Sequence, residues 1–240
     1  MGVAANKTDL RVLAVLPAYN EEKSIADVAG RTLRAYPGID VLVVNDCSTD
    51  ATEAVLKRQH INYVTLPVNL GIGGAVQTGF LYAWEQGYDV VVQVDGDGQH
   101  PPEQIPLLVD ALVARRLDLV IGSRYAGKTQ IVSSWARRVG GAVLGAVIRL
   151  TTGHRVTDPT SGFRAYSRQA LDYLRRFYPQ EYPEPICAIE LLVNGYSLGE
   201  VPVTMQERQH GKSSITGLDT LFYMIKVIFS IAIVKIRRRK

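Results

Sequence analysis

Short runs of Val, Leu and Ile alternate along the first half of the chain with longer segments in which apolar residues recur every three or four positions. The runs occupy residues 11–20, 40–46, 62–68, 89–95 and 118–125, and the longer segments occupy residues 21–37, 48–59, 72–86 and 101–116. Continuous apolar runs are typical of strands buried on both faces, and the longer segments are typical of amphipathic helices. Their alternation predicts an α/β fold with a Rossmann-like, mostly parallel sheet and helices on both faces.

The second half of the chain is less regular. A glycine-spaced helix is predicted over residues 133–150, and a short strand is predicted near residues 200–206. Between them lie TDPTSGFRAYSR (157–168) and a segment rich in Tyr and Pro, FYPQEYPEPICAIE (177–190). We assign no regular element to these two segments from the sequence.

Polar side chains follow several of the predicted strands, at the point where each strand ends. The carboxyl ends of parallel strands meet at one edge of a sheet, where ligands bind. Asp95 and Asp97 follow the fourth strand, and a tight turn through Gly96 would let both carboxylates approach one cation. Mg²⁺ or Mn²⁺ suits such oxygen ligands, and Mg²⁺ usually shares a site with waters and phosphate oxygens. The pair therefore indicates a metal shared with a diphosphate, and turn or cap chemistry is the alternative.

Seven motifs in order resemble those of family 2 glycosyltransferases of the GT-A type, and in particular the dolichyl- or polyprenyl-phosphate sugar (mannose or glucose) synthases. The resemblance covers roughly residues 10–214. The motifs are PAYNEE (17–22), VVNDCSTD (43–50), NLGIGGA (69–75), VDGDGQHPP (94–102), GSRY (122–125), DPTSGFR (158–164) and RQHGKSS (208–214).

The resemblance implies a role for particular residues in binding a nucleotide sugar. Asp95 and Asp97 would hold the metal with Gln99 close by, and Arg124 would approach the acceptor or the diphosphate. Asn45 stands where the family more usually has the first Asp of a pair, which leaves the base preference open. The other implied positions are Pro17, Tyr19 and Glu21 at the base and ribose, Asp46 at the base, Gly96 between the metal ligands, and Arg208, Lys212, Ser213 and Ser214 in a loop that closes over the phosphates.

The resemblance further implies an inverting, metal-dependent transfer of a hexose from a GDP-mannose or UDP-glucose type of donor to a polyprenyl phosphate. A phosphate acceptor is already ionised, whereas a sugar hydroxyl of a glycolipid or cell-surface polysaccharide would need a general base. Asp158 is the first candidate for that base, and its alternative role is to brace its loop. Glu184 and Glu190 are further candidates. A nucleotide-sugar-binding regulator without catalytic activity is the third possibility.

The positive charge of the chain is concentrated at its end. The formal net charge is +4, but five basic residues lie within 235–240, and without them the charge would be −1. This distribution argues against nucleic acid as a partner and for a local electrostatic anchor. We predict a glycosyltransferase domain over residues 1–214 and an amphipathic helix with a basic tail over 215–240, peripheral on the cytoplasmic face of the cell membrane. Packing of this helix on the body of the protein or on a second subunit is the alternative, and the partners considered are a second copy of the chain or a membrane protein.

Overall fold

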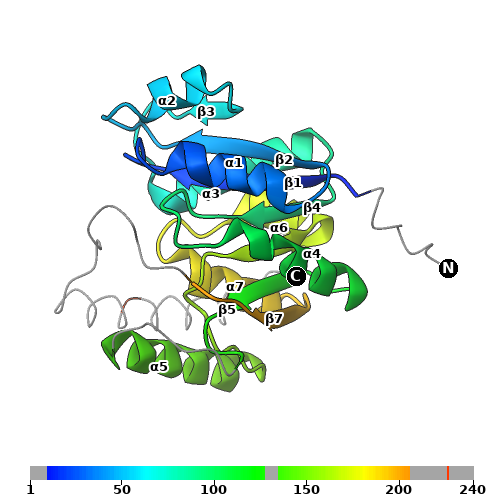
Figure 1. Cartoon of the computed structure of the whole chain (residues 1–240). Coiled ribbons are helices and arrows are strands. Elements are labelled where there is room, and N and C mark those ends of the chain that lie inside the picture. The colour runs from blue at the N-terminus through cyan, green and yellow to red at the C-terminus, as the bar shows by residue number, and fades with distance from the viewer. Residues whose placement is uncertain (1–9, 128–134, 206–225, 227–240) are drawn as a thin grey trace.

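The computed structural model describes residues 10–127, 135–205 and 226, and it places one seven-stranded sheet between two layers of helices (Figure 1). The predicted C-terminal helix, the 214/215 boundary and the 208–214 loop lie outside the described residues. The elements are β1 (Val12–Ala18), α1 (Ile25–Ala35), β2 (Ile39–Asn45), α2 (Thr52–Arg58), β3 (Tyr63–Thr65), α3 (Gly71–Glu85), β4 (Val90–Gln93), the 3₁₀ helix η2 (Pro102–Gln104), α4 (Ile105–Ala114), β5 (Leu119–Ser123), α5 (Trp135–Thr152), β6 (Arg164–Ser167), α6 (Arg168–Phe177), α7 (Pro183–Val193) and β7 (Leu198–Pro202).

The strand order is β3-β2-β1-β4-β6-β5-β7. β6 is antiparallel to both of its neighbours, β4 and β5, and the other pairings in the sheet are parallel. The α/β class and the mostly parallel sheet are therefore confirmed. The direction of β6 has a consequence for the site, because its first residue lies at the edge where β4 and β5 end. The segment that precedes β6, 157–163, is thereby brought to the carboxyl edge of the parallel strands.

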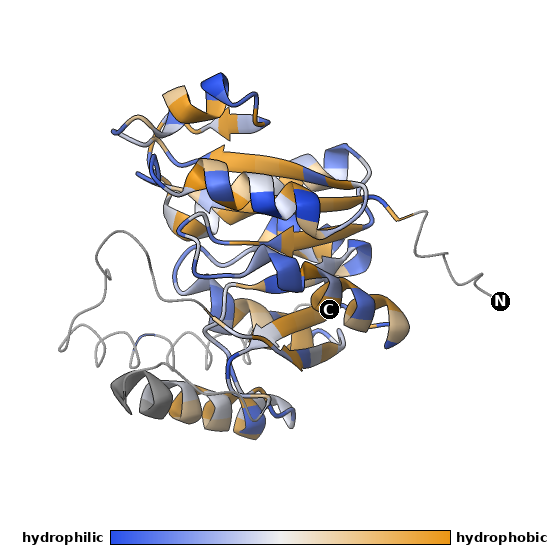
Figure 2. Cartoon of the chain, in the orientation of Figure 1, coloured by the Kyte–Doolittle hydropathy of each residue, from blue (hydrophilic) through white to orange (hydrophobic). Residues whose placement is uncertain are grey.

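Helices cover both faces of the sheet, and alternate residues of each strand point to opposite faces. Leu13 and Val15 of β1 pack with α3, α6 and α7, whereas Val12, Ala14 and Leu16 pack with α1 and α4. The central strands are coloured mostly hydrophobic in Figure 2. This double cover explains the continuous apolar runs of the sequence.

Three elements of the second half are absent from the sequence-based assignment: β6, α6 and α7. β6 is only four residues long and begins with a charged residue, Arg164, so it has no apolar run to reveal it. The start of α6 has a recognisable sequence signal, the N-cap residue Ser167. Its hydroxyl accepts a hydrogen bond from the Ala170 N–H (3.1 Å). α7 begins with Pro183 and Pro185 in its first turn, which is a recognisable helix start.

Candidate active site

The loops that follow β1 and β2 are joined by hydrogen bonds between the motifs PAYNEE and NDCSTD. The Asn20 N–H donates to Ser48 Oγ (2.9 Å), and Asn20 Oδ1 accepts from the Thr49 N–H (2.8 Å). The Glu21 N–H donates to Thr52 Oγ1 (2.9 Å). Asn20 has a φ of 58°, in the left-handed region that Asn tolerates better than most residues. These hydrogen bonds hold the two loops together, and we call them the wall of the site beside the carboxyl edge of the sheet.

The residues expected at the base and ribose all lie on this wall. Pro17 is buried in β1, while the Tyr19 side chain is 47% exposed at its end. Asp46 is buried, and its Oδ1 accepts a hydrogen bond from the Leu70 N–H (2.7 Å). Asp46 therefore also fixes the loop that leads into α3.

Asn45 has a structural role that explains its departure from the family pattern. Its side chain is buried, its Nδ2 donates to Thr65 Oγ1 (3.2 Å), and its Oδ1 accepts from the Ser48 N–H (3.2 Å). The amide therefore supplies one donor and one acceptor. It links β3 to the loop after β2.

Asp95 and Asp97 lie directly after β4, at the centre of the carboxyl edge. The Asp95 side chain is 33% exposed, whereas Asp97 is 6% exposed and its Oδ1 accepts from the Gln99 N–H (3.0 Å). His100 is buried and stacks on Phe163 (5.3 Å between centroids). Its Nδ1 accepts from the Asp95 N–H (3.2 Å), so this nitrogen carries no proton in that bond. The 3.6 Å approach of the same nitrogen to Asp95 Oδ2 is consequently not an ion pair.

The loop before β6 packs closely against the Asp95 carboxylate. A Cβ placed on Gly162 would lie 3.1 Å from both Asp95 oxygens and 3.4 Å from Gln93 Nε2. On the other side, a Cβ on Gly96 would lie 3.1 Å from the Pro17 carbonyl oxygen. Both glycines are therefore needed for close approach.

Gly162→Ala should lower kcat about 10- to 100-fold, because a displacement near 1 Å at a reacting centre can have that effect. The free energy of unfolding should fall by only about 1 kcal/mol, because the partly exposed carboxylate can move aside. Gly141→Ala is the control, since nothing lies within 4 Å of its added Cβ. Kinetics and thermal unfolding of both variants check this. Unchanged kcat in Gly162→Ala would contradict the close packing.

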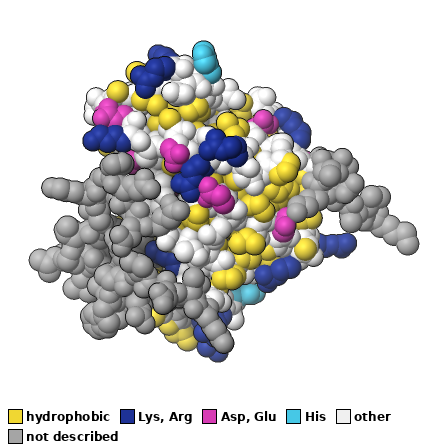
Figure 3. Space-filling model, viewed as in Figure 1, with side chains coloured by type: hydrophobic (Ala, Val, Ile, Leu, Met, Phe, Trp, Pro, Cys, Tyr) yellow, Lys and Arg dark blue, Asp and Glu magenta, His cyan; other side chains and the backbone are white. Residues whose placement is uncertain are grey.

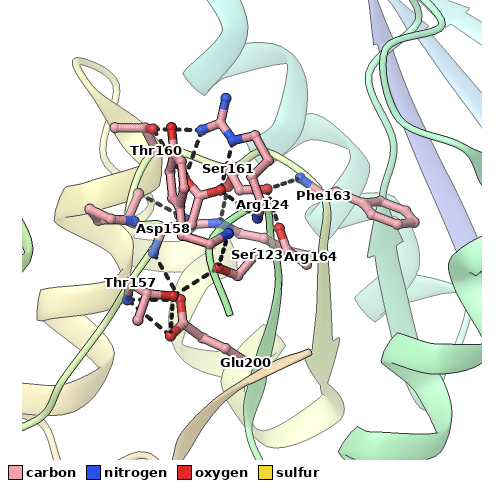
Figure 4. Close-up of polar contacts among 12 residues, drawn as sticks. Ser123, Arg124, Thr157, Asp158, Thr160, Ser161, Phe163, Arg164 and Glu200 are labelled. Carbon is pink, nitrogen blue, oxygen red and sulfur yellow. Dashed lines mark hydrogen bonds and ion pairs between the residues drawn. The ribbon is translucent and has the colours of Figure 1, made fainter. Parts of the chain in front are cut away.

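Arg124 and Asp158 form a bidentate ion pair at the same edge of the sheet as Asp95 (Figure 4). Arg124 Nε donates to Asp158 Oδ2 and Arg124 Nη2 donates to Asp158 Oδ1, both at 2.7 Å. The Arg124 backbone N–H also donates to Oδ2 (3.0 Å), and Nη2 contacts Thr160 Oγ1 (3.0 Å). Asp158 is fully buried, and both of its carboxylate oxygens accept hydrogen bonds from Arg124. The geometry supports the bracing role of Asp158 over the role of general base.

The Arg124 guanidinium keeps one nitrogen, Nη1, that makes no hydrogen bond to the described residues, and its side chain is 24% exposed. Burial lowers the pKa of Arg124, but hydrogen bonding to Asp158 and the charge of Asp158 outweigh this and raise the pKa above its ordinary value. Asp95 adds to the rise, which places the two side chains within electrostatic range. Arg124 is thus a permanent cation, and its charge interacts with that of the carboxylate expected to hold the metal.

Two further groups lie behind Asp95. Arg164 is fully buried and donates to the carbonyl oxygens of Ser161 (2.6 Å), Glu184 (2.7 Å) and Pro159 (2.8 Å), which joins the 157–163 loop to the start of α7. Burial raises the pKa of the Glu184 carboxyl; the charge of Arg164 opposes the rise and that of Asp95 adds to it.

Glu190 has a structural partner in the neighbouring helix. Its Oε2 accepts a hydrogen bond from the Tyr173 hydroxyl (2.7 Å), between α6 and α7.

The structure brings Asp95, Asp97, Gly96, Gln99, Arg124 and Asp158 together at one edge, with Pro17, Tyr19, Glu21 and Asp46 on the adjoining wall. Arg208, Lys212, Ser213 and Ser214 lie outside the described residues.

Sequence reasoning did not identify Gly162, Arg164 or Glu200 as contributors. Gly162 lies within the 157–163 loop, and the side chains of Arg164 and Glu200 form hydrogen bonds with its backbone. These contacts depend on the antiparallel direction of β6. The motif DPTSGFR carried a signal for Gly162 and Arg164, because both lie within it, whereas Glu200 had none.

Two features of the described residues concern the expected metal and the expected membrane anchor. Within 10–127 and 135–205, no group of three or more His, Cys, Asp or Glu side chains converges as a metal site, which leaves the Asp95/Asp97 pair as a two-carboxylate arrangement. No helix in the same part of the chain has both the length and the apolar character needed to cross a bilayer.

Comparisons with known proteins identify the family of the chain. The model of glycosyl transferase family 2 matches residues 13–175. The chain is 35% identical over 229 residues to polyprenol monophosphomannose synthase of Mycolicibacterium smegmatis, covering 90% of this chain and 85% of that protein. It is 34% identical over 220 residues to undecaprenyl-phosphate mannosyltransferase of Micrococcus luteus, covering 87% and 88%.

Among solved structures, glucosyl-3-phosphoglycerate synthase of Mycobacterium tuberculosis, in complex with Mn²⁺, UDP and glucosyl-3-phosphoglycerate, superposes with a TM-score of 0.71 at 23% identity. The match covers 98% of this chain and 82% of that one. The fold is that of the GT-A glycosyltransferases. The chain belongs to glycosyl transferase family 2, and the protein is a glycosyltransferase.

Proposed function

We propose that this protein transfers a hexose from a nucleotide sugar to the phosphate of a polyprenyl lipid. The observation that carries the proposal is the Arg124–Asp158 pair, in which the carboxylate is occupied and the guanidinium keeps a nitrogen, Nη1, that bonds no residue within 10–127 or 140–205. Such a site suits an acceptor that is already an anion, and it needs no base to activate it. The names of the two mannose-transferring relatives support the same acceptor class.

The donor diphosphate would lie between the wall that carries Asp46 and the acids after β4. Asp95 and Asp97, with Gln99 close by, fit a divalent cation such as Mg²⁺ or Mn²⁺, since hard oxygen ligands and an incomplete ligand set leave room for phosphate oxygens. When bound, the metal would neutralise the negative charge that develops on the departing nucleoside diphosphate. Arg124 would align the acceptor phosphate for attack on the anomeric carbon. One direct displacement inverts that centre.

Transfer of label from sugar to lipid tests the proposal. The full-length protein is incubated with undecaprenyl phosphate, Mg²⁺ or Mn²⁺ and one GDP- or UDP-linked hexose at a time, and the organic phase is counted. One donor, of the GDP-mannose or UDP-glucose type, should give an extractable product. Nucleotide binding without an extractable product from any donor would contradict the proposal.

Transfer to a sugar hydroxyl is the second candidate, and Glu184 favours it. Its carboxyl lies within electrostatic range of Asp95, and its raised pKa is a property that a general base at neutral pH would need. A water-soluble or glycolipid product labelled by the same donors would support this candidate.

We also propose that residues 215–240 hold the protein on the cytoplasmic face of the membrane. On the face drawn in Figure 3, basic and acidic side chains lie intermixed. Among the described residues, Arg31 pairs with Asp27 (3.6 Å) and with Glu103 (2.8 Å). A surface of mixed charge gives little attraction to anionic lipid, whereas the five basic residues within 235–240 would contribute about 1 kcal/mol each.

Deletion of residues 217–240 should release the protein from anionic vesicles at low salt, because most of the electrostatic attraction is removed with the tail. Sedimentation with vesicles that contain an anionic lipid measures this, and neutral vesicles are the control. If the truncated protein sediments as the full-length protein does, the tail is not the anchor.

A further inference from the structure

Glu200 lies on β7, opposite Ile121 of β5, and its carboxylate reaches the loop that carries Asp158 (Figure 4). The Thr157 N–H donates to Oε1 (3.0 Å) and Oε2 (2.9 Å), and the Asp158 N–H donates to Oε1 (2.9 Å). The Thr157 hydroxyl donates to Oε2 (2.9 Å). One carboxylate thus accepts from two successive backbone N–H groups and a hydroxyl.

These bonds lead to Arg124 by two routes. On the first route, the fixed backbone of Asp158 places the carboxylate that holds the Arg124 side chain through Nε and Nη2. On the second, Thr157 Oγ1 lies 2.8 Å from Ser123 Oγ, which in turn accepts from the Tyr125 N–H (3.1 Å). Glu200 therefore fixes the backbone on both sides of Arg124 as well as its side-chain partner.

We propose that Glu200 is a positioning residue for the acceptor phosphate and that it acts through Arg124. The inference rests on the proposed function, in which Arg124 receives that phosphate. Glu200 itself faces the loop and not the crevice acids, so its effect falls on the acceptor side of the reaction. The Asp95/Asp97 side has contacts outside that loop, with the Gln99 N–H and His100.

Glu200→Gln tests the carboxylate specifically, because it removes the negative charge and preserves the shape of the side chain. The neutral amide can accept through one oxygen only, and its NH₂ group would meet an N–H donor where Oε1 or Oε2 now accepts. Charge-assisted hydrogen bonds of this kind are roughly twice as strong as neutral ones. The loop should shift, and Arg124 should lose its fixed geometry.

The KM for undecaprenyl phosphate should rise about tenfold in Glu200→Gln, as expected for the loss of about one charge-assisted hydrogen bond. The KM for the nucleotide sugar should stay within about twofold, because Glu200 bonds Thr157 and Asp158, at the end of the loop away from Gly162 and Asp95. Glu85→Gln, at the exposed end of α3, is the matched control and should leave both values unchanged. Glu200→Asp retains the carboxylate and should recover part of the loss.

A double-mutant cycle separates positioning from general destabilisation. In an Arg124→Ala background, Glu200→Gln should cause no further change in the acceptor KM, since the residue it acts through is gone. An equal additional loss in that background, or a parallel rise in the donor KM, would overturn the inference.

A second readout does not depend on the acceptor. The ¹⁵Nε–H signal of Arg124, identified by its loss in Arg124→Ala, should exchange slowly in the wild type and broaden or move in Glu200→Gln. If the wild type transfers no sugar to any polyprenyl phosphate, the proposed function fails and this signal still decides whether Glu200 positions Arg124. An unchanged signal would overturn the inference by itself.

Discussion

Asp97→Asn should lower kcat about 100- to 1,000-fold, the range expected when one charge-stabilising group is removed from an active site. Asn keeps the Oδ1 that accepts from the Gln99 N–H, so the turn after β4 should stay folded. What is lost is the negative charge that a divalent cation requires. Activity should also become far less sensitive to added Mn²⁺ or Mg²⁺.

Steady-state kinetics at several metal concentrations, with calorimetry of Mn²⁺ binding in the presence of the nucleoside diphosphate, measures this effect. Asp110→Asn on the exposed side of α4 makes the same chemical change away from the crevice and should behave as the wild type does. Full activity in Asp97→Asn with an unchanged metal response would remove Asp97 from the metal site.

Asp158→Asn should have the second largest effect, and it should act on both stability and activity. Removal of one charge from a buried ion pair leaves the other uncompensated, and this lowers the free energy of unfolding by about 3 kcal/mol. Arg124 would lose its bidentate partner, so the KM for the acceptor should rise. Denaturant unfolding and kinetics with both substrates measure the two effects.

The pH profile distinguishes this account from the one in which Asp158 is a general base. If Asp158 only holds Arg124, residual activity in Asp158→Asn should keep the pH dependence of the wild type. Thr160→Ala is the control. It removes a hydroxyl that accepts from Arg124 Nη2 (3.0 Å) and donates to Asp158 Oδ1 (3.4 Å), it leaves both charges in place, and it should lower stability by about 1 kcal/mol. Loss of the acid limb of the profile in Asp158→Asn would restore the general-base role.

The main features of the crevice could be predicted from the sequence, since they depend on local patterns. The apolar run that ends in Asp95 and Asp97 is visible without any tertiary information. The ends of β1, β2 and β5 are equally clear. Parallel strands necessarily bring their carboxyl ends to one edge, so the neighbourhood of these residues follows from the order of elements.

The part that could not be predicted depends on β6. Four residues, beginning with a buried arginine, have no strand-like pattern, and the arginine is tolerated because three carbonyl oxygens surround it. Without β6, nothing places Gly162 against Asp95 or Asp158 against Arg124. The role of Glu200 is hidden for the same reason, because its partners are 42 and 43 positions away in the sequence.

The most direct test of the central claim is the linkage in the product made from undecaprenyl phosphate and the active nucleotide sugar. NMR of the purified lipid should show the anomeric proton coupled to phosphorus, with the anomeric configuration opposite to that of the donor. This result would show that the acceptor phosphate attacks the anomeric carbon in one displacement. A sugar joined to a hydroxyl oxygen, with no coupling to phosphorus, would contradict the account and make Glu184 the residue to test as the base.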